Sequence, residues 1–151
     1  MFSMIVYSLG ALATAIVVTL LIAGLTPLRR KDEARPGMTF AIALFLFGAG
    51  PFFLTEVQTA VWGRSLSEVA EEGYYEAGLG GELAYHKVVL FQGDRARLLV
   101  VGREPSEWGG EDRPSAWVYA RKAPTGWVVD HATPINSDKE RRDGIRFPPY
   151  W

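Results

Sequence analysis

Two long stretches without a charged side chain occupy the first third of the chain, and a short basic segment separates them. Residues 1–28 and 38–55 contain no Asp, Glu, Lys or Arg. A bilayer core of about 30 Å is spanned by about 20 apolar residues of helix. The pattern therefore predicts two transmembrane helices, residues 1–28 and 38–63, joined by a tight turn at residues 29–37. The turn carries basic residues at four positions: Arg29, Arg30, Lys31 and Arg35.

A cleaved signal peptide is the alternative explanation for the N-terminal apolar run. The triplets Ala11-Leu12-Ala13 and Ala13-Thr14-Ala15 match the small-residue pattern of a cleavage site. However, no basic residue precedes the apolar region, and the region continues unbroken to Leu28. These departures favour a retained helix. Its small residues between Gly10 and Ala15 would let a second helix approach closely.

The second apolar run is interrupted by Gly48, Gly50 and Pro51. Proline removes one backbone hydrogen bond and usually kinks a helix, so we expect a kink near Pro51. Glu56 would lie roughly 27 Å along the helix from Met38, at about 1.5 Å per residue. Its carboxylate could belong to a proton or ion path, but this depth favours an ordinary position at the far headgroup boundary. There Trp62 fits an aromatic belt.

Orientation follows from the bias of Lys and Arg in short loops, which face the cytoplasm. The turn at residues 29–37 is basic, whereas Arg64 is the only basic residue between the second helix and Lys87. We therefore expect the turn in the cytoplasm, and the N-terminus and residues 64–151 outside it. The predicted location is the inner or cell membrane of a bacterium.

Residues 64–151 are predicted to form a small α+β domain with an antiparallel sheet of roughly four strands. Ser65-Leu66-Ser67-Glu68 matches a capping box, so a helix should begin at residue 66 and run to about residue 77, although it could instead continue the second helix. The glycines of residues 78–81 then indicate a hinge. Strands are expected on both sides of the turn Gly93-Asp94 and in a second hairpin; the four ranges are 84–92, 95–101, 115–121 and 127–133.

Two features of these strands predict how the sheet packs. The runs 88–91 and 98–101 are apolar on both faces, so both faces should be covered by a helix, lipid or a partner. Along residues 116–121, Trp117 and Tyr119 alternate with small side chains, so bulky and small faces should separate.

No catalytic, cofactor-binding or metal-binding constellation is evident. The chain has no cysteine, which excludes thiolate chemistry and disulfides. Its histidines are His86 and His131, without metal-ligand spacing. Asp130 and His131 are neighbours in a predicted strand, so they should point to opposite faces and not pair. The acidic cluster Glu71, Glu72 and Glu76 should be a solvated helix face. From residue 64 onward acidic residues slightly outnumber basic ones, which argues against nucleic acid as a partner.

Aromatic residues at the end of the chain suggest a docking surface. Phe147, Tyr150 and Trp151 lie beside prolines, and prolines lower the entropy lost on docking. The tail could pack on its own domain, on lipid or on a partner; Trp108, in a polar loop, is a further candidate interface residue. The predicted function is a non-catalytic accessory, scaffolding or assembly subunit of a larger membrane complex, with lipid and other subunits as partners. The alternative is a membrane-anchored extracytoplasmic module that binds or senses a ligand.

Overall fold

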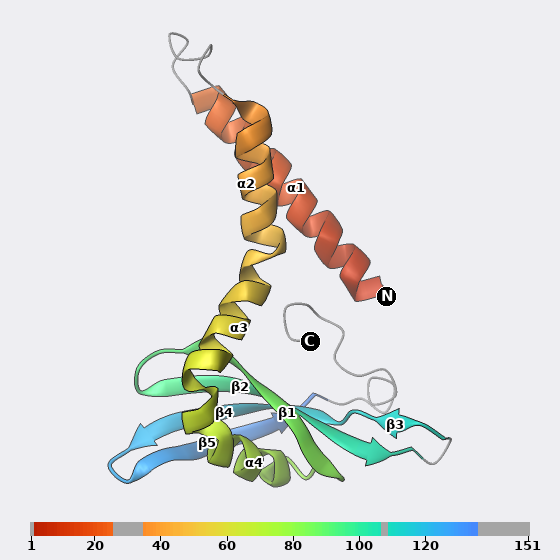
Figure 1. Cartoon of the computed structure of the whole chain (residues 1–151), viewed down its shortest axis with the longest axis vertical. Helices are drawn as coiled ribbons and strands as arrows, with labels where there is room; N and C mark the ends of the chain where they lie inside the picture. The colour runs from red at the N-terminus through yellow and green to blue at the C-terminus, as the bar shows by residue number, and fades with distance from the viewer. Residues whose placement is uncertain (1, 26–34, 107–108, 136–151) are drawn as a thin grey trace. The chain divides into compact units, whose positions relative to one another are not determined.

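The computed structural model describes residues 2–25, 35–106 and 109–135 (Figure 1). The chain forms two compact units, and the boundary between them lies between Phe53 and Leu54. The basic residues Arg29, Arg30 and Lys31, the loop residue Trp108 and the tail with Phe147, Tyr150 and Trp151 lie outside the described residues.

The first unit contains a helical pair. Helix α1 spans Phe2–Leu25 and helix α2 spans Pro36–Gly48. Ile5–Leu25 is long and apolar enough to cross a membrane, although a signal sequence can be equally long and apolar. Helix α2 is long enough only if it is counted together with the helix that follows, and the two are bent against each other. Helix α2 begins at Pro36 rather than at the predicted Met38, because proline fits the first helical position, where no N–H bond is needed.

Alanines make the buried contact between α1 and α2. Ala11 and Ala15 on α1 and Ala43 on α2 are buried, whereas large apolar residues such as Leu9, Leu20 and Phe45 are exposed. Ala11 and Ala15 are one turn apart, so they share one face of the helix. Small side chains thus lie where the two helices pack, and the larger side chains face away from the pair.

A one-residue break separates α2 from helix α3, which spans Gly50–Trp62. Ala49 leaves the helical pattern between the two predicted kink residues Gly48 and Gly50. Pro51 has no N–H to donate to the carbonyl four residues earlier, that of Phe47. The break therefore lies within the interrupted segment that the sequence indicates.

Beyond α3 the chain stays helical. A 3₁₀ turn, η2, spans Gly63–Leu66, and helix α4 follows at Ser67–Glu76. The predicted capping box is wrong: the Ser65 hydroxyl donates to the carbonyl of Trp62, and no side chain caps α4. The reason is that the backbone is already helical before Ser65, so the N–H groups that a cap would serve belong to a continuing helix. The alternative, a continuation of the second helix, describes the chain better.

An antiparallel five-stranded sheet completes the α+β fold. The strands are β1 (Glu82–Phe91), β2 (Arg95–Pro105), β3 (Glu111–Asp112), β4 (Ser115–Ala123) and β5 (Gly126–Pro134). The order is β1-β2-β4-β5, and the two-residue β3 pairs with β2. The predicted four strands are the long ones; β3 is too short for an alternation pattern to reveal. Gly93 has a φ of 73°, which explains glycine in the β1–β2 turn.

Helix α4 covers one face of the sheet (Figure 1). The core contains Leu66, Val69 and Tyr74 from the helical side and small residues of the sheet: Val88, Ala96, Leu98, Val100, Ala116, Val118 and Ala120. The predicted small face of β4 is therefore the one that meets α4. A Cβ on Gly73 would lie 2.6 Å from Val118 Cγ2, so glycine allows the helix to approach this closely.

The opposite face of the sheet, here the second face, carries the larger side chains of the same strands. It includes Lys87, Arg97, Leu99, Trp117 and Tyr119, which the register aligns in adjacent rows. Leu98, Leu99 and Val100 are fully buried, and Val101 is nearly so, which agrees with the prediction that both faces of this run are covered. In the other predicted run, on β1, Leu90 is 43% exposed, so the prediction is wrong there.

Candidate functional site

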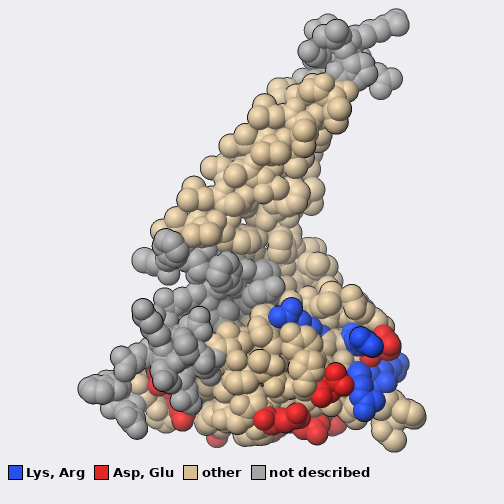
Figure 2. All heavy atoms as spheres, turned by 180° about the vertical axis from the view of Figure 1, so that it is seen from behind, with Lys and Arg blue, Asp and Glu red and all other residues tan. Residues whose placement is uncertain are grey.

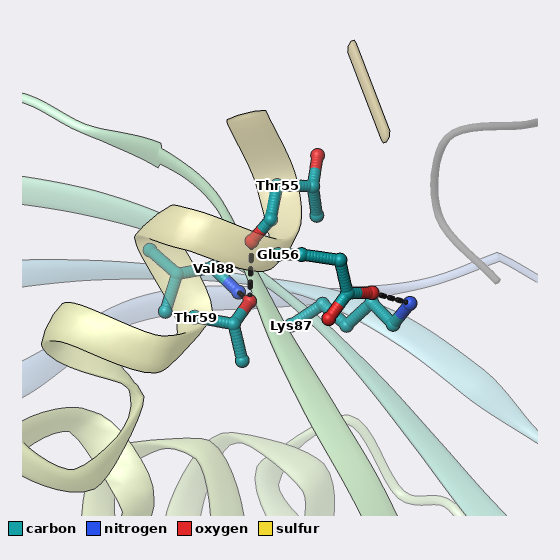
Figure 3. Close-up of polar contacts among 5 residues, drawn as sticks. All are labelled: Thr55, Glu56, Thr59, Lys87 and Val88. Atoms are coloured by element: carbon teal, nitrogen blue, oxygen red, sulfur yellow. Dashed lines mark hydrogen bonds and ion pairs between the residues drawn. The ribbon is translucent and has the colours of Figure 1, made fainter. Parts of the chain in front are cut away.

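The edge of the sheet at β1 meets α3 through polar contacts (Figure 3). The Thr59 hydroxyl donates to the carbonyl of Thr55 at 2.7 Å and accepts from the Val88 N–H at 2.9 Å. Lys87 Nζ lies 2.5 Å from Glu56 Oε1, with the lysine side chain 14% exposed and the glutamate 61%. His86 Nε2 lies 3.0 Å from the Gly63 carbonyl, which can only accept, so this nitrogen carries the proton. Helix α3 and η2 thus cover the edge of β1.

Apart from Glu56, whose side chain is 61% exposed, the side chains of α3 are distributed in the reverse of the usual amphipathic pattern. Thr55 is 3% exposed, and Thr59 bonds to β1. By contrast, the apolar residues Leu54, Val57 and Val61 are 56%, 40% and 61% exposed. A helix on a water-soluble domain normally buries its apolar stripe and exposes its polar face. The outer face of α3 is therefore suited to an apolar surrounding.

The contacts of α3 also show how it passes the sheet. Trp62, near its C-terminal end, stacks on Phe91 at 4.2 Å and packs against the core on the α4 side. Thr59 meets the edge of β1, and Glu56 pairs with Lys87, which lies on the second face. Helix α3 therefore arrives from the side of the second face and crosses the edge toward α4.

Within the first unit, Tyr7 occupies the break between α2 and α3. Its hydroxyl lies 2.9 Å from the carbonyls of both Phe47 and Gly48. The Phe47 carbonyl is the one that Pro51 leaves without its helical donor. The Tyr7 ring also meets Phe52 edge to face at 5.9 Å. A hydroxyl from α1 thus satisfies backbone acceptors exposed by the helix break, a contact that the sequence pattern does not reveal.

A row of cationic and aromatic side chains crosses the second face. Arg97 Cζ lies 4.0 Å from the Trp117 ring centroid and 5.3 Å from that of Tyr119, and Tyr119 stacks on His131 at 4.2 Å. Each such cation–π contact contributes about 0.5–2 kcal/mol, depending on desolvation. Arg97 Nε is buried without a hydrogen-bond partner among the described residues.

The prediction that Asp130 and His131 do not pair is wrong. His131 Nδ1 lies 3.3 Å from Asp130 Oδ2, and Arg121 Nε lies 3.6 Å from Asp130 Oδ1. The register shifts between Tyr119 and Ala120, so β5 carries a bulge at this point. A bulge breaks the alternation of side chains, which brings neighbours to the same side. All three side chains are more than half exposed, so the pairs are weak in water.

The remaining polar groups form no recognisable centre in the described part of the chain. No group of three His, Cys, Asp or Glu residues there could hold a metal ion. Glu71, Glu72 and Glu76 are exposed on α4. Burial raises the pKa of Tyr85 above its usual value, an effect that the nearby Arg113 guanidinium partly offsets. The raised pKa keeps this tyrosine neutral at ordinary pH.

The structure places the predicted candidates in different surroundings. Glu56 pairs with Lys87 at the sheet edge, and Trp62 stacks inside the second unit. Arg35 is the N-cap residue of α2, and its side chain makes no capping hydrogen bond. Lys87, Thr59 and Tyr7, which sequence reasoning did not single out, make the contacts that matter most here.

Comparison with known protein families, with curated proteins and with solved structures finds no match to this chain.

Proposed function

We propose that this chain is a non-catalytic integral membrane protein that acts as an accessory, scaffolding or assembly subunit of a larger membrane complex. The segment 29–37 would lie in the cytoplasm and the sheet domain outside it. The observation that carries the proposal is the reversed polarity of α3. Its residues Leu54, Val57 and Val61 are exposed, and so are many large apolar residues of α1 and α2. Lipid or an apolar partner would favour this arrangement, whereas water would not.

The contacts of α1 support its role as a retained anchor rather than a cleaved signal. Removal of α1 would expose Ala43 and leave the carbonyls of Phe47 and Gly48 without the Tyr7 hydroxyl. An unsatisfied backbone group in lipid costs several kcal/mol. The hydrogen bonds therefore favour a helix pair that stays together.

Purification of the full chain in a mild detergent tests the proposal. We expect the protein to resist extraction by alkaline carbonate and to co-purify with other membrane subunits. A monomer that purifies alone, with no associated subunit, would contradict the accessory role. Stabilisation of that monomer by a small ligand in a thermal-shift screen would favour the alternative, an extracytoplasmic binding or sensing module.

A further inference from the structure

Three arginines gather on the second face at the end where the hairpin turns lie. The register places Arg95 directly opposite Arg121 and Arg97 opposite Tyr119. Like charges directly opposite each other across two strands are destabilising. Asp130 contacts Arg121, but Arg95 and Arg97 have no carboxylate partner among the described residues. The fold thus maintains a concentration of positive charge that its own described carboxylates do not neutralise.

The α4 side of the same unit has the opposite charge. Helix α4 carries no Lys or Arg and exposes four carboxylates: Glu68, Glu71, Glu72 and Glu76. In Figure 2, acidic side chains run along the lower side of the domain, where Figure 1 has α4, and basic side chains gather above them at the turn end. The carboxylates of α4 and the three arginines therefore lie on opposite sides of the sheet, although the chain as a whole has a net charge of only −1.

We propose that the second face docks on the anionic phosphate headgroups of the bilayer, through Arg95, Arg97 and Arg121. This inference rests on the membrane anchoring proposed above. Guanidinium groups bind phosphate oxygens in a bidentate manner. Trp117 and Tyr119 beside them are partly buried and amphipathic, which is the character favoured at the headgroup layer. The four carboxylates of α4 would be repelled by the same surface, so both charges orient the domain in one way.

The absence of cysteine makes a direct test possible in the full chain. Thr133 is exposed and paired with Trp117 on the second face, and Ser67 is exposed on α4. Thr133→Cys and Ser67→Cys chains carry a nitroxide label and are reconstituted into vesicles of phosphatidylcholine alone or with an equal part of phosphatidylglycerol. Collision with a water-soluble nickel chelate reports how accessible each label is. We expect the label at position 133 to be shielded in anionic vesicles and accessible in neutral ones, with position 67 accessible in both.

Charge variants test the role of the arginines. Arg95→Gln with Arg121→Gln should lower the ratio of docked to undocked domain by about fivefold per arginine, since each basic residue near an anionic surface contributes a factor of that size. The matched control, Arg64→Gln with Lys122→Gln, removes the same charge from exposed positions outside the patch and should leave the ratio unchanged. In about 1 M salt the Debye length is about 3 Å, so the unmodified chain should show the same fall in the ratio of docked to undocked domain as the arginine variant.

Several outcomes would overturn the inference. The first is a label at position 133 that is accessible in both kinds of vesicle. The second is a label that is shielded equally in neutral vesicles and in detergent; this result would mean that residues 136–151 or another protein occupies this face. An equal response to the control pair would also reject it. If the arginine variant fails to fold, the dependence on lipid and salt in the unmodified chain still decides. Failure of the chain to float with any vesicle would instead reject the membrane anchoring itself.

Discussion

At the scale of single residues, Pro51 and Tyr7 act together. Pro51 removes the donor for the Phe47 carbonyl, and the Tyr7 hydroxyl from another helix replaces it at 2.9 Å. The same hydroxyl contacts the Gly48 carbonyl at 2.9 Å. The kink is predictable from glycines and proline alone. The donor is not, because it lies forty residues away in the sequence and nothing local marks it.

Tyr7→Phe should destabilise the helix pair by about 0.5–2 kcal/mol, because it removes the hydroxyl and leaves the ring. In a Pro51→Ala background the backbone regains a donor for Phe47, so the same substitution should cost less. Titration of the full chain with sodium dodecyl sulfate in mixed micelles measures both costs. Tyr75→Phe, at an exposed tyrosine of α4, is the control and should have little effect. Equal costs in the two backgrounds would show that Tyr7 does not compensate for Pro51.

Gly73 is a second residue whose role depends on a distant neighbour. Gly73→Ala should destabilise the sheet unit by about 1–3 kcal/mol, because the added methyl group would overlap Val118. Val118→Ala in the same chain should recover part of this loss. Near-ultraviolet circular dichroism during denaturation provides the free energies of unfolding. Glu71→Ala, on the exposed side of α4, should change stability by less than about 0.5 kcal/mol. If the double variant loses as much free energy of unfolding as the two single variants together, the close contact between Gly73 and Val118 is contradicted.

At the scale of elements, the edge of β1 is covered by α3 rather than left open. An exposed edge strand offers free N–H and C=O groups to other chains. Here the outward N–H of Val88 donates to the Thr59 hydroxyl, and the Lys87 side chain pairs with Glu56. The last turns of the second predicted helix therefore belong structurally to the sheet unit.

Thr59→Val should therefore weaken the α3–β1 contact by about 1–3 kcal/mol, because it preserves the shape and leaves the Val88 N–H without its acceptor. Thr59→Ser keeps the hydroxyl and should lose much less. Hydrogen exchange of the Val88 amide in the full chain is the measurement, with faster exchange expected for the valine variant alone. The same exchange rate in both variants would mean that the hydroxyl does not protect this edge.

Local signals in the sequence were sufficient for some elements and not for others. The Gly93-Asp94 turn and the small face of β4 follow from residue chemistry and alternation. The capping box failed because the same serine and glutamate can lie inside a continuing helix, as Ser65 does. Strand alternation also failed at Asp130 and His131, because the bulge depends on how β4 and β5 pair. The candidate contacts of Glu56 and Trp62 depend on the position of α3 against the sheet, which no local pattern specifies.

At the scale of the whole molecule, the proposed topology rests on the distribution of charge along the chain. Arg29, Arg30, Lys31 and Arg35 are concentrated in a segment between two charge-free stretches. Basic residues close to the ends of membrane helices set their orientation, whereas those farther than about 15–20 residues away contribute little. The basic residues of the sheet unit from Lys87 onward should therefore affect docking but not topology.

A reporter that is active only outside the cytoplasm, fused after Trp151, should be active if this orientation is right. Replacement of the four basic residues of segment 29–37 by glutamine should scramble insertion, because no strong charge difference would then remain across the helix pair. The matched control replaces Arg95, Arg103, Arg121 and Lys122 by glutamine; it removes the same charge from the sheet unit and should leave the topology intact. A paired fusion to a cytoplasm-specific reporter gives the opposite readout. Cytoplasmic activity of the unmodified chain would reject the orientation, and with it the docking of the second face on the outer surface of the membrane.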